Sequence, residues 1–176
     1  QLDHILNLKK NLNFKNKKIL NFGAGHGGFS ILVSFLGAHV TEIDTTDYDA
    51  KCFNRNITRF SDFSNVLDKK FDLIYASHTL EHVTDIAFVL QMFKKVSHDN
   101  TFYYFEVPNG KVDLKSNNVF HTHFFFKEFF EKIFSQVENR NDHFLNIENK
   151  ERNGKFVDVE SDDLVTMTNH SLNTDF

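Results

Sequence analysis

The sequence has a single cysteine, Cys52, a single proline, Pro108, and no tryptophan. One cysteine excludes an internal disulfide and a zinc site built from cysteines. It is also typical of a reducing compartment, so we expect a cytoplasmic protein. No apolar run approaches the roughly 20 residues that a membrane-spanning helix needs, and no signal peptide is visible. We therefore expect no membrane partner.

An excess of basic residues is also lacking. The chain has 20 Lys and Arg against 24 Asp and Glu, which gives a net charge of −4. This balance argues against a broad nucleic-acid-binding face, and we expect no nucleic-acid partner. What the sequence does have is phenylalanine, 22 residues in a chain of 176. These side chains are expected to fill the core of a single domain.

Apolar runs alternate with helical patterns along the chain, which predicts an α/β fold with a doubly wound, mostly parallel sheet. We expect a helical segment over 1–16, one domain over 17–160 and a polar tail, 161–176, frayed at its end. Residues 97–100 are expected to form a turn. The predicted strands are 18–22, 39–43, 57–60, 71–76 and 102–107, with further strand-like segments at 136–139 and 155–159. The predicted helices are 28–36, 86–96 and 127–134.

A glycine-rich turn follows the first predicted strand. Gly23, Gly25 and Gly27 allow the backbone to approach a ligand closely, and the helix that follows presents free N–H groups. Asp44 ends the next strand, where its carboxylate can accept hydrogen bonds from two ribose hydroxyls. Gly23, Gly25 and Gly28 also match the G-x-G-x-x-G motif of dinucleotide-binding sites. The glycine turn can therefore bind a dinucleotide, bind another adenosine-containing ligand, or serve only the packing of strand against helix.

Polar features follow each of the first four predicted strands. These features are the glycine turn, Asp44, Asp62 and the segment 77–82. Because ligands of parallel sheets bind beyond the carboxyl ends of the strands, we expect these residues to lie at one edge and to form a single site.

The chain resembles the class I S-adenosylmethionine-dependent methyltransferases, in the branch of small-molecule enzymes that includes the type 11 and type 23 methyltransferase families. Three stretches of the sequence carry this resemblance. They are 20–27 (LNFGAGHG) with Asp44, 71–83 (FDLIYASHTLEHV), and 107–109 (VPN) followed by 121–125 (HTHFF). The resemblance implies a Rossmann-like seven-stranded sheet whose last strand, here 155–159, is antiparallel. It also implies S-adenosylmethionine as cofactor and S-adenosylhomocysteine as product.

The same resemblance implies a set of cofactor-binding residues. They are Asn21, Gly23, Ala24, Gly25, Gly27, Asp44, Thr45, Asp62, Phe63, Ser77 and His78. One of them departs from the family pattern, because the family has Asp or Glu where this chain has Asn21. A neutral amide brings no charge to the ammonium group of the cofactor, and charge-assisted hydrogen bonds are roughly twice as strong as neutral ones. This departure predicts weaker cofactor binding.

Histidines are the candidate catalytic residues. Methyl transfer needs alignment of the acceptor with the methyl group, and a base only where the acceptor must lose a proton. His78 and then His82 are the candidate bases, since both follow the fourth strand. His121 and His123 are candidates for substrate contact. Their His-x-His spacing also suits a metal, but with no cysteine nearby we expect none.

The leading prediction is methyl transfer to a hydroxyl or amine of a small biosynthetic metabolite, such as a sugar or glycan precursor. The first alternative is a degenerate cofactor-binding module, suggested by Asn21 and the short chain. A dinucleotide-dependent oxidoreductase has only the glycine motif in its favour. An RNA methyltransferase is disfavoured by the acidic balance and by Ser77-His78-Thr79-Leu80 in place of an Asn-Pro-Pro-aromatic sequence. The oligomeric state is not predicted.

Overall fold

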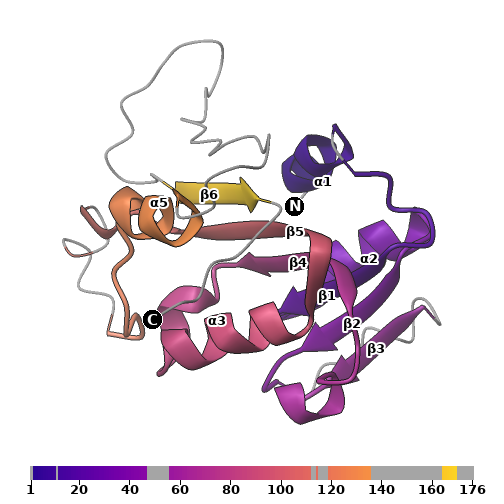
Figure 1. Ribbon diagram of the computed structural model, residues 1–176, viewed down its shortest axis with the longest axis horizontal. Helices are drawn as coiled ribbons and strands as arrows, with labels where there is room; N and C mark the ends of the chain where they lie inside the picture. Colours follow the sequence, from indigo (N-terminus) through magenta and orange to yellow (C-terminus); the bar gives the residue numbers. More distant parts are fainter. Residues whose placement is uncertain are drawn as a thin grey trace.

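The computed structural model describes residues 2–10, 12–46, 56–111, 114, 119–135 and 164–169. Within them the strands form a six-stranded sheet in the order β3-β2-β1-β4-β5-β6 (Figure 1). The strands β1 to β5 run parallel, and β6 pairs antiparallel with β5. Their bounds are Lys18–Phe22 (β1), His39–Ile43 (β2), Ile57–Phe60 (β3), Phe71–Ser77 (β4), Ser97–Pro108 (β5) and Leu164–Asn169 (β6). The order reverses between β1 and β4, and this is where doubly wound sheets bind ligands.

Helices cover both faces of the sheet (Figure 1). The helices are α1 (Leu2–Lys9), α2 (Gly28–Phe35), α3 (Ile86–Lys95) and α5 (Lys127–Ser135), with short 3-10 turns η2 (Phe63–Asn65) and η3 (Leu80–His82). One core cluster joins α3 and α5 to the sheet, and another joins α1 and α2 to the opposite face. Consecutive residues of β4 enter opposite clusters, Leu73 in one and Ile74 in the other. This is why the middle of β4, Leu73 to Ala76, is largely apolar.

The helix α3 shows how local sequence sets an element. Asp85 precedes it, and its carboxylate accepts a hydrogen bond of 2.9 Å from the backbone N–H of Phe88. Val89, Leu90 and Phe93 then face the core at helical spacing. Lys94 and Lys95 lie in the last turn, where positive charge complements the helix dipole. The cap at Asp85 therefore fixes the start of α3 just after η3, beside the switch point of the sheet.

Two sequence expectations at the end of the chain and in β5 are wrong. The residues 97–100, expected to be a turn, begin β5, because Thr101 Oγ1 donates a 2.7 Å hydrogen bond to Phe71 O and accepts one from His98 N. A register shift between Phe71 and Leu73 accommodates this polar start. Residues 164–169, expected in a frayed tail, form β6. The expected strands at 136–139 and 155–159 lie outside the described residues.

Candidate functional site

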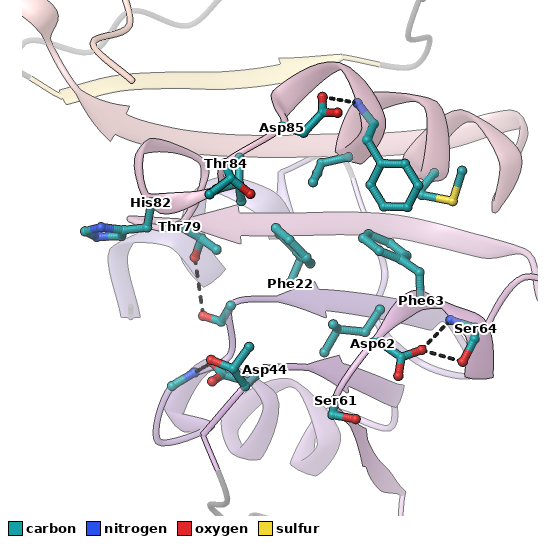
Figure 2. Close-up of a pocket in the computed structure, with 18 of the residues that line it drawn as sticks. Phe22, Asp44, Ser61, Asp62, Phe63, Ser64, Thr79, His82, Thr84 and Asp85 are labelled. Carbon is teal, nitrogen blue, oxygen red and sulfur yellow. Dashed lines mark hydrogen bonds between the residues drawn. The ribbon is translucent and has the colours of Figure 1, made fainter. Parts of the chain in front are cut away.

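A cleft of about 930 Å³ opens at the carboxyl ends of β1 to β4. Figure 2 shows Asp44, Asp62, Thr79 and Asp85 around it, with His82 drawn at one end of the view and Ser64 at the other. The volume lies within the range of small-molecule sites. The switch point of the sheet is therefore hollowed, as the convergence of polar segments predicts.

The glycine loop after β1 forms one wall of the cleft. Gly23 has a φ of +70°, and a Cβ built on it would lie 2.0 Å from Thr79 Oγ1. Gly25 has a φ of +53° and faces open space, with no atom within 4 Å of a built Cβ. Gly23 therefore lets the loop pack under the segment that follows β4, while Gly25 leaves room for a ligand.

Asp44 is held by the loops on both sides of it. Its Oδ2 accepts a 2.6 Å hydrogen bond from Gly25 N, and its Oδ1 accepts hydrogen bonds from the backbone N–H and hydroxyl of Thr46. Burial by itself would raise the pKa of Asp44, but the Thr46 and Gly25 hydrogen bonds and the charge of Arg59 lower it below its usual value. The carboxylate is thus ionised at neutral pH and points along the cleft wall.

A buried ion pair between Arg59 and Glu42 supports the two loops that hold Asp44. Arg59 Nε donates to Glu42 Oε2 at 2.8 Å, across paired positions of β3 and β2. The other guanidinium nitrogens donate to Gly25 O at 2.6 Å and Thr46 O at 3.2 Å. The Glu42 side chain is fully buried and that of Arg59 is 10% exposed. Arg59 therefore holds the loop of Gly25 and the loop of Thr46 in one fixed arrangement.

Asp62 and Phe63 border the cleft after β3, as the sequence predicts. The carboxylate of Asp62 caps η2 by accepting from Ser64 N at 2.7 Å. Hydrogen bonds from the Ser64 hydroxyl and backbone N–H lower the pKa of Asp62. The ring of Phe63 stacks on that of Phe22, with centroids 5.3 Å apart. An apolar, aromatic floor thus lies beside a fixed carboxylate.

His78 lies between two buried glutamates at the end of β4. Its Nε2 is 3.3 Å from Glu106 Oε1, and its Nδ1 is 3.5 Å from Glu81 Oε1. The interaction with Glu106 and then that with Glu81 raise the pKa of His78 to about 9, against the effect of burial. His78 is therefore a cation at neutral pH and, in this arrangement, a hydrogen-bond donor instead of a base.

Glu106 continues this polar network through the sheet toward α1. Its Oε2 lies 2.9 Å from His4 Nε2 and accepts a 2.9 Å hydrogen bond from the Tyr104 hydroxyl. His4 Nδ1 lies 2.7 Å from the Tyr75 hydroxyl. Burial would raise the pKa of Glu106, but the contacts with His4 and His78 lower it well below its usual value. The end of α1 is thereby connected to the wall of the cleft.

The structure brings most, but not all, of the predicted site residues to the cleft. The predicted residues that line it are Gly23, Gly25, Asp44, Thr45, Asp62, Phe63, His78 and His82. The predicted residues that are not among its described lining residues are Asn21, Ala24, Gly27, Ser77, His121 and His123. Asn21 is 2% exposed and donates to Ser30 Oγ on α2 at 2.8 Å. The His121 ring lies 4.8 Å from that of His82, between centroids.

Several residues of the site escaped the sequence analysis. The largest group lies on or just before α3 and lines the cleft, namely Thr84, Asp85, Phe88, Val89, Met92 and Lys95. Glu42, Arg59 and Glu106 also escaped it, although each is a charged residue within a predicted strand. A charge inside an otherwise apolar strand is a usable signal, because buried charges are seldom left unpaired.

Comparisons with known proteins agree with this geometry. A family model described as a methyltransferase domain matches residues 2–154. No curated protein matches the sequence. A SAM-dependent methyltransferase from Archaeoglobus fulgidus is 19% identical, with 92% of this chain and 78% of that chain covered and a TM-score of 0.63.

Two further solved structures are similar. An S-adenosylmethionine-dependent methyltransferase from Mesorhizobium loti is 21% identical, with 62% of this chain and 55% of that chain covered and a TM-score of 0.50. DhpI in complex with SAH is 18% identical, with 60% and 54% covered and a TM-score of 0.51. The chain thus spans little more than half the length of these two proteins. At such identities the likeness shows the fold.

Proposed function

The chain belongs to the methyltransferase domain family, and from this premise we propose that it binds S-adenosylmethionine in the cleft and transfers the methyl group to a small-molecule acceptor. The observation that supports this most directly is Asp44 at the end of β2, facing the cleft beside the glycine loop. The family match agrees with the resemblance to class I enzymes in the sequence. A dinucleotide-dependent oxidoreductase keeps only the glycine motif in its favour.

The acceptor capacity of Asp44 fits a ribose. A carboxylate has about four lone-pair sites, and the three hydrogen bonds from Gly25 and Thr46 take three of them. The remaining site is on Oδ2, the oxygen that accepts from Gly25 N, and a Cβ built on Gly25 meets nothing within 4 Å. A ribose hydroxyl can donate there without displacing the loop. Its neighbouring hydroxyl would replace the bond from the Thr46 hydroxyl.

The far wall of the cleft fits an adenine. Phe22 and Phe63 present stacked aromatic surface, and Asp62 presents a carboxylate beside them. When bound, S-adenosylmethionine supplies a methyl group already activated on a sulfonium. This chain then has to hold the cofactor, align an acceptor and exclude water. Asn21 is bonded to Ser30 and supplies no charge to the site, so binding is expected to be weaker than with an acid at this position.

The finer parts of the proposal rest on the sequence. The family resemblance implies an acceptor with a hydroxyl or amine, such as a sugar or glycan precursor, and a sheet with seven strands and an antiparallel last strand. The single cysteine favours a cytoplasmic location, and the acidic balance favours no nucleic-acid partner. His78 and His82 stay the candidate catalytic residues, His78 as a hydrogen-bond donor and His82 as the candidate base. No helix in the described part of the chain is long and apolar enough to cross a membrane.

Calorimetric titration of the full chain with S-adenosylhomocysteine tests the proposal, with NAD as the competing ligand. We expect micromolar binding, about −8 kcal/mol, and no heat with NAD. Asp44→Ala should abolish binding, because the carboxylate that accepts from the ribose is lost. Asp99→Asn is the matched control, because Asp99 is exposed at the amino end of β5, away from the cleft.

Three outcomes would count against the proposal. NAD binding without S-adenosylhomocysteine binding would favour the oxidoreductase. Binding of S-adenosylhomocysteine with no methyl transfer to a panel of hydroxyl and amine acceptors would favour the degenerate module. Failure of folded protein to bind either ligand would remove the proposal.

A further inference from the structure

Glu81 is a buried carboxylate whose nearest positive neighbour is the imidazole of His78. Its residue is 1% exposed, and within the described part of the chain neither of its carboxylate oxygens accepts a hydrogen bond. Among the described residues, its ion-pair distances are to imidazole nitrogens, 3.5 Å to His78 and 4.0 Å to His82. Burying a carboxylate is costly unless it is paired and hydrogen-bonded or binds a metal. The position of Glu81 therefore calls for a further positive partner.

The His82 ring is oriented as a metal ligand is. Its Nδ1 lies 3.0 Å from the backbone carbonyl oxygen of Phe120, which can only accept, so Nδ1 carries the proton. The neutral ring then has its lone pair on Nε2, and Nε2 is the atom that faces Glu81. A backbone carbonyl that fixes the tautomer in this way is the usual outer partner of a metal-bound histidine. His82 also lines the cleft, so the position is open to solutes.

His121 is brought to the same place by a clamped loop. The backbone N–H groups of Thr122 and His123 both donate to Glu81 O, and the Thr122 hydroxyl donates to Val83 O at 2.7 Å. The loop after β5 is thus tied to η3. The ligating atoms of Glu81, His82 and His121 all lie within 4.8 Å of one another.

We propose that Glu81, His82 and His121 form a binding site for a divalent transition-metal cation at the edge of the cleft. Two imidazoles and one carboxylate suit Zn²⁺, Fe²⁺ or Co²⁺ and leave coordination positions open. From the sequence alone we expect no metal, because cysteines are lacking, but a site made of two histidines and a glutamate needs no cysteine. A cation here gives the buried carboxylate a second positive partner in addition to His78.

The open positions define the class of acceptor. They face the cleft through His82, so an acceptor with an oxygen that can coordinate the cation, such as a diol or a hydroxy acid, would be held beside the methyl group. This part of the inference rests on the proposed function, whereas metal binding does not. His82 then acts as a ligand, in place of the base that the sequence predicts.

Titration of the full, chelator-treated chain with Co²⁺, followed by visible absorption, tests the site. We expect one bound cation per chain, displaced by Zn²⁺, with an affinity that falls at least tenfold in H82A, H121A and E81Q. Loss of a group that merely hydrogen-bonds to a metal ligand already lowers metal affinity about 10–100-fold, and loss of a ligand should cost at least as much. His39→Ala is the matched control, because His39 is an exposed histidine on β2, and it should bind as tightly as the wild type.

The result that would overturn the site is wild-type affinity in H121A or H82A, or an equal loss in H39A, since either would place the cation elsewhere. Absence of Co²⁺ and Zn²⁺ binding at millimolar concentrations would overturn it too. Circular dichroism checks that each variant is folded. If E81Q unfolds, H121A still decides the matter, because His121 lies on a surface loop.

Asp44→Ala separates this inference from the proposed function. It should lose S-adenosylhomocysteine and keep Co²⁺, while H121A should lose Co²⁺ and keep S-adenosylhomocysteine. Absence of S-adenosylhomocysteine binding in the wild type would remove the proposed function and leave the metal site standing. Absence of Co²⁺ binding alone would remove only the site.

Discussion

Gly23 and Gly25 both adopt a positive φ, yet only Gly23 has a side chain packed against it. Alanine at either position incurs strain of about 1–2 kcal/mol from the left-handed backbone. At Gly23 the added Cβ also meets Thr79, and overpacking adds about 1–3 kcal/mol. We expect Gly23→Ala to destabilise the fold by about 2–5 kcal/mol and Gly25→Ala by about 1–2 kcal/mol.

Urea denaturation of both variants checks this difference. S-Adenosylhomocysteine affinity should fall in both, because the first variant displaces the loop and the Cβ added at Gly25 would enter the cleft. Equal stability of the two variants would show that Thr79 moves aside without cost.

The residue scale is also where sequence reasoning fails most. Asp44 and Asp62 could be placed correctly because each directly follows a strand, and the ends of parallel strands meet. Arg59 could not, since its function depends on which atoms of two other loops lie above β3. The contact of Glu106 with His4 is equally hidden, because it joins residues 102 positions apart and crosses from the sheet to α1.

At the scale of elements, the Glu42–Arg59 pair joins β2 and β3 to the loops that form the cleft. Arg59→Met leaves Glu42 buried and unpaired, and breaking a buried pair costs about 3–5 kcal/mol. The double variant Arg59→Met, Glu42→Met removes both charges, so we expect most of the stability to return.

Binding should not return in that double variant, because Gly25 O and Thr46 O still lack their donor. Denaturation and calorimetry of both variants measure the two effects. If the double variant binds S-adenosylhomocysteine normally, Arg59 serves stability alone.

The helix α1 is attached to the sheet by a polar contact as well as an apolar one. His4→Ala removes one partner of the buried Glu106 carboxylate, which keeps Tyr104 and His78, and the imidazole partner of the buried Tyr75 hydroxyl. A hydrogen bond to a charged group contributes about 1.5–3 kcal/mol and a neutral one about 0.5–1.5 kcal/mol, so we expect a loss of about 1–3 kcal/mol of unfolding free energy in urea. His39→Ala should be neutral. An unchanged midpoint for His4→Ala would mean that Ile5 and Leu8 alone dock the helix.

Predictability differed between elements for a physical reason. The bounds of β1, β2 and β3 match the sequence prediction, and each strand carries buried apolar residues, which are Ile19 and Leu20, Val40 and Ile43, and Ile57. The start of β5 differs from the sequence prediction, because residues 97–100 are polar and join the sheet beside a register shift between Phe71 and Leu73. The segment 164–169 begins a tail that is mostly polar, and its pairing depends on an edge that β5 provides.

At the scale of the whole molecule, Asp72 links separate parts of the sheet. It accepts from Lys17 Nζ at 3.0 Å and Lys18 N at 2.8 Å, and His98 Nε2 lies 3.7 Å away. Burial would raise the pKa of Asp72, but these hydrogen bonds and charges lower it below 3.8. Because the folded pKa is the lower one, the stabilisation is present above about pH 4 and is lost as pH falls through the folded value.

Asp72→Asn should therefore be less stable than the wild type at pH 7. The gap should narrow as pH falls below about 4. Urea midpoints across this pH range measure it, with Asp99→Asn as the control. A gap that does not change with pH would mean that the charge of Asp72 contributes nothing.

The placement of Thr79 over Gly23 has a consequence for how the molecule folds. The two residues are 56 positions apart, and they meet only when β4 has paired with β1. During synthesis the first three strands emerge before β4 exists, so the loop that ends β1 lacks its cover throughout that interval. Pairings between distant segments form slowly because loop closure precedes them. The ligand-binding competence of this chain should therefore appear late in folding, when β4 enters the centre of the sheet.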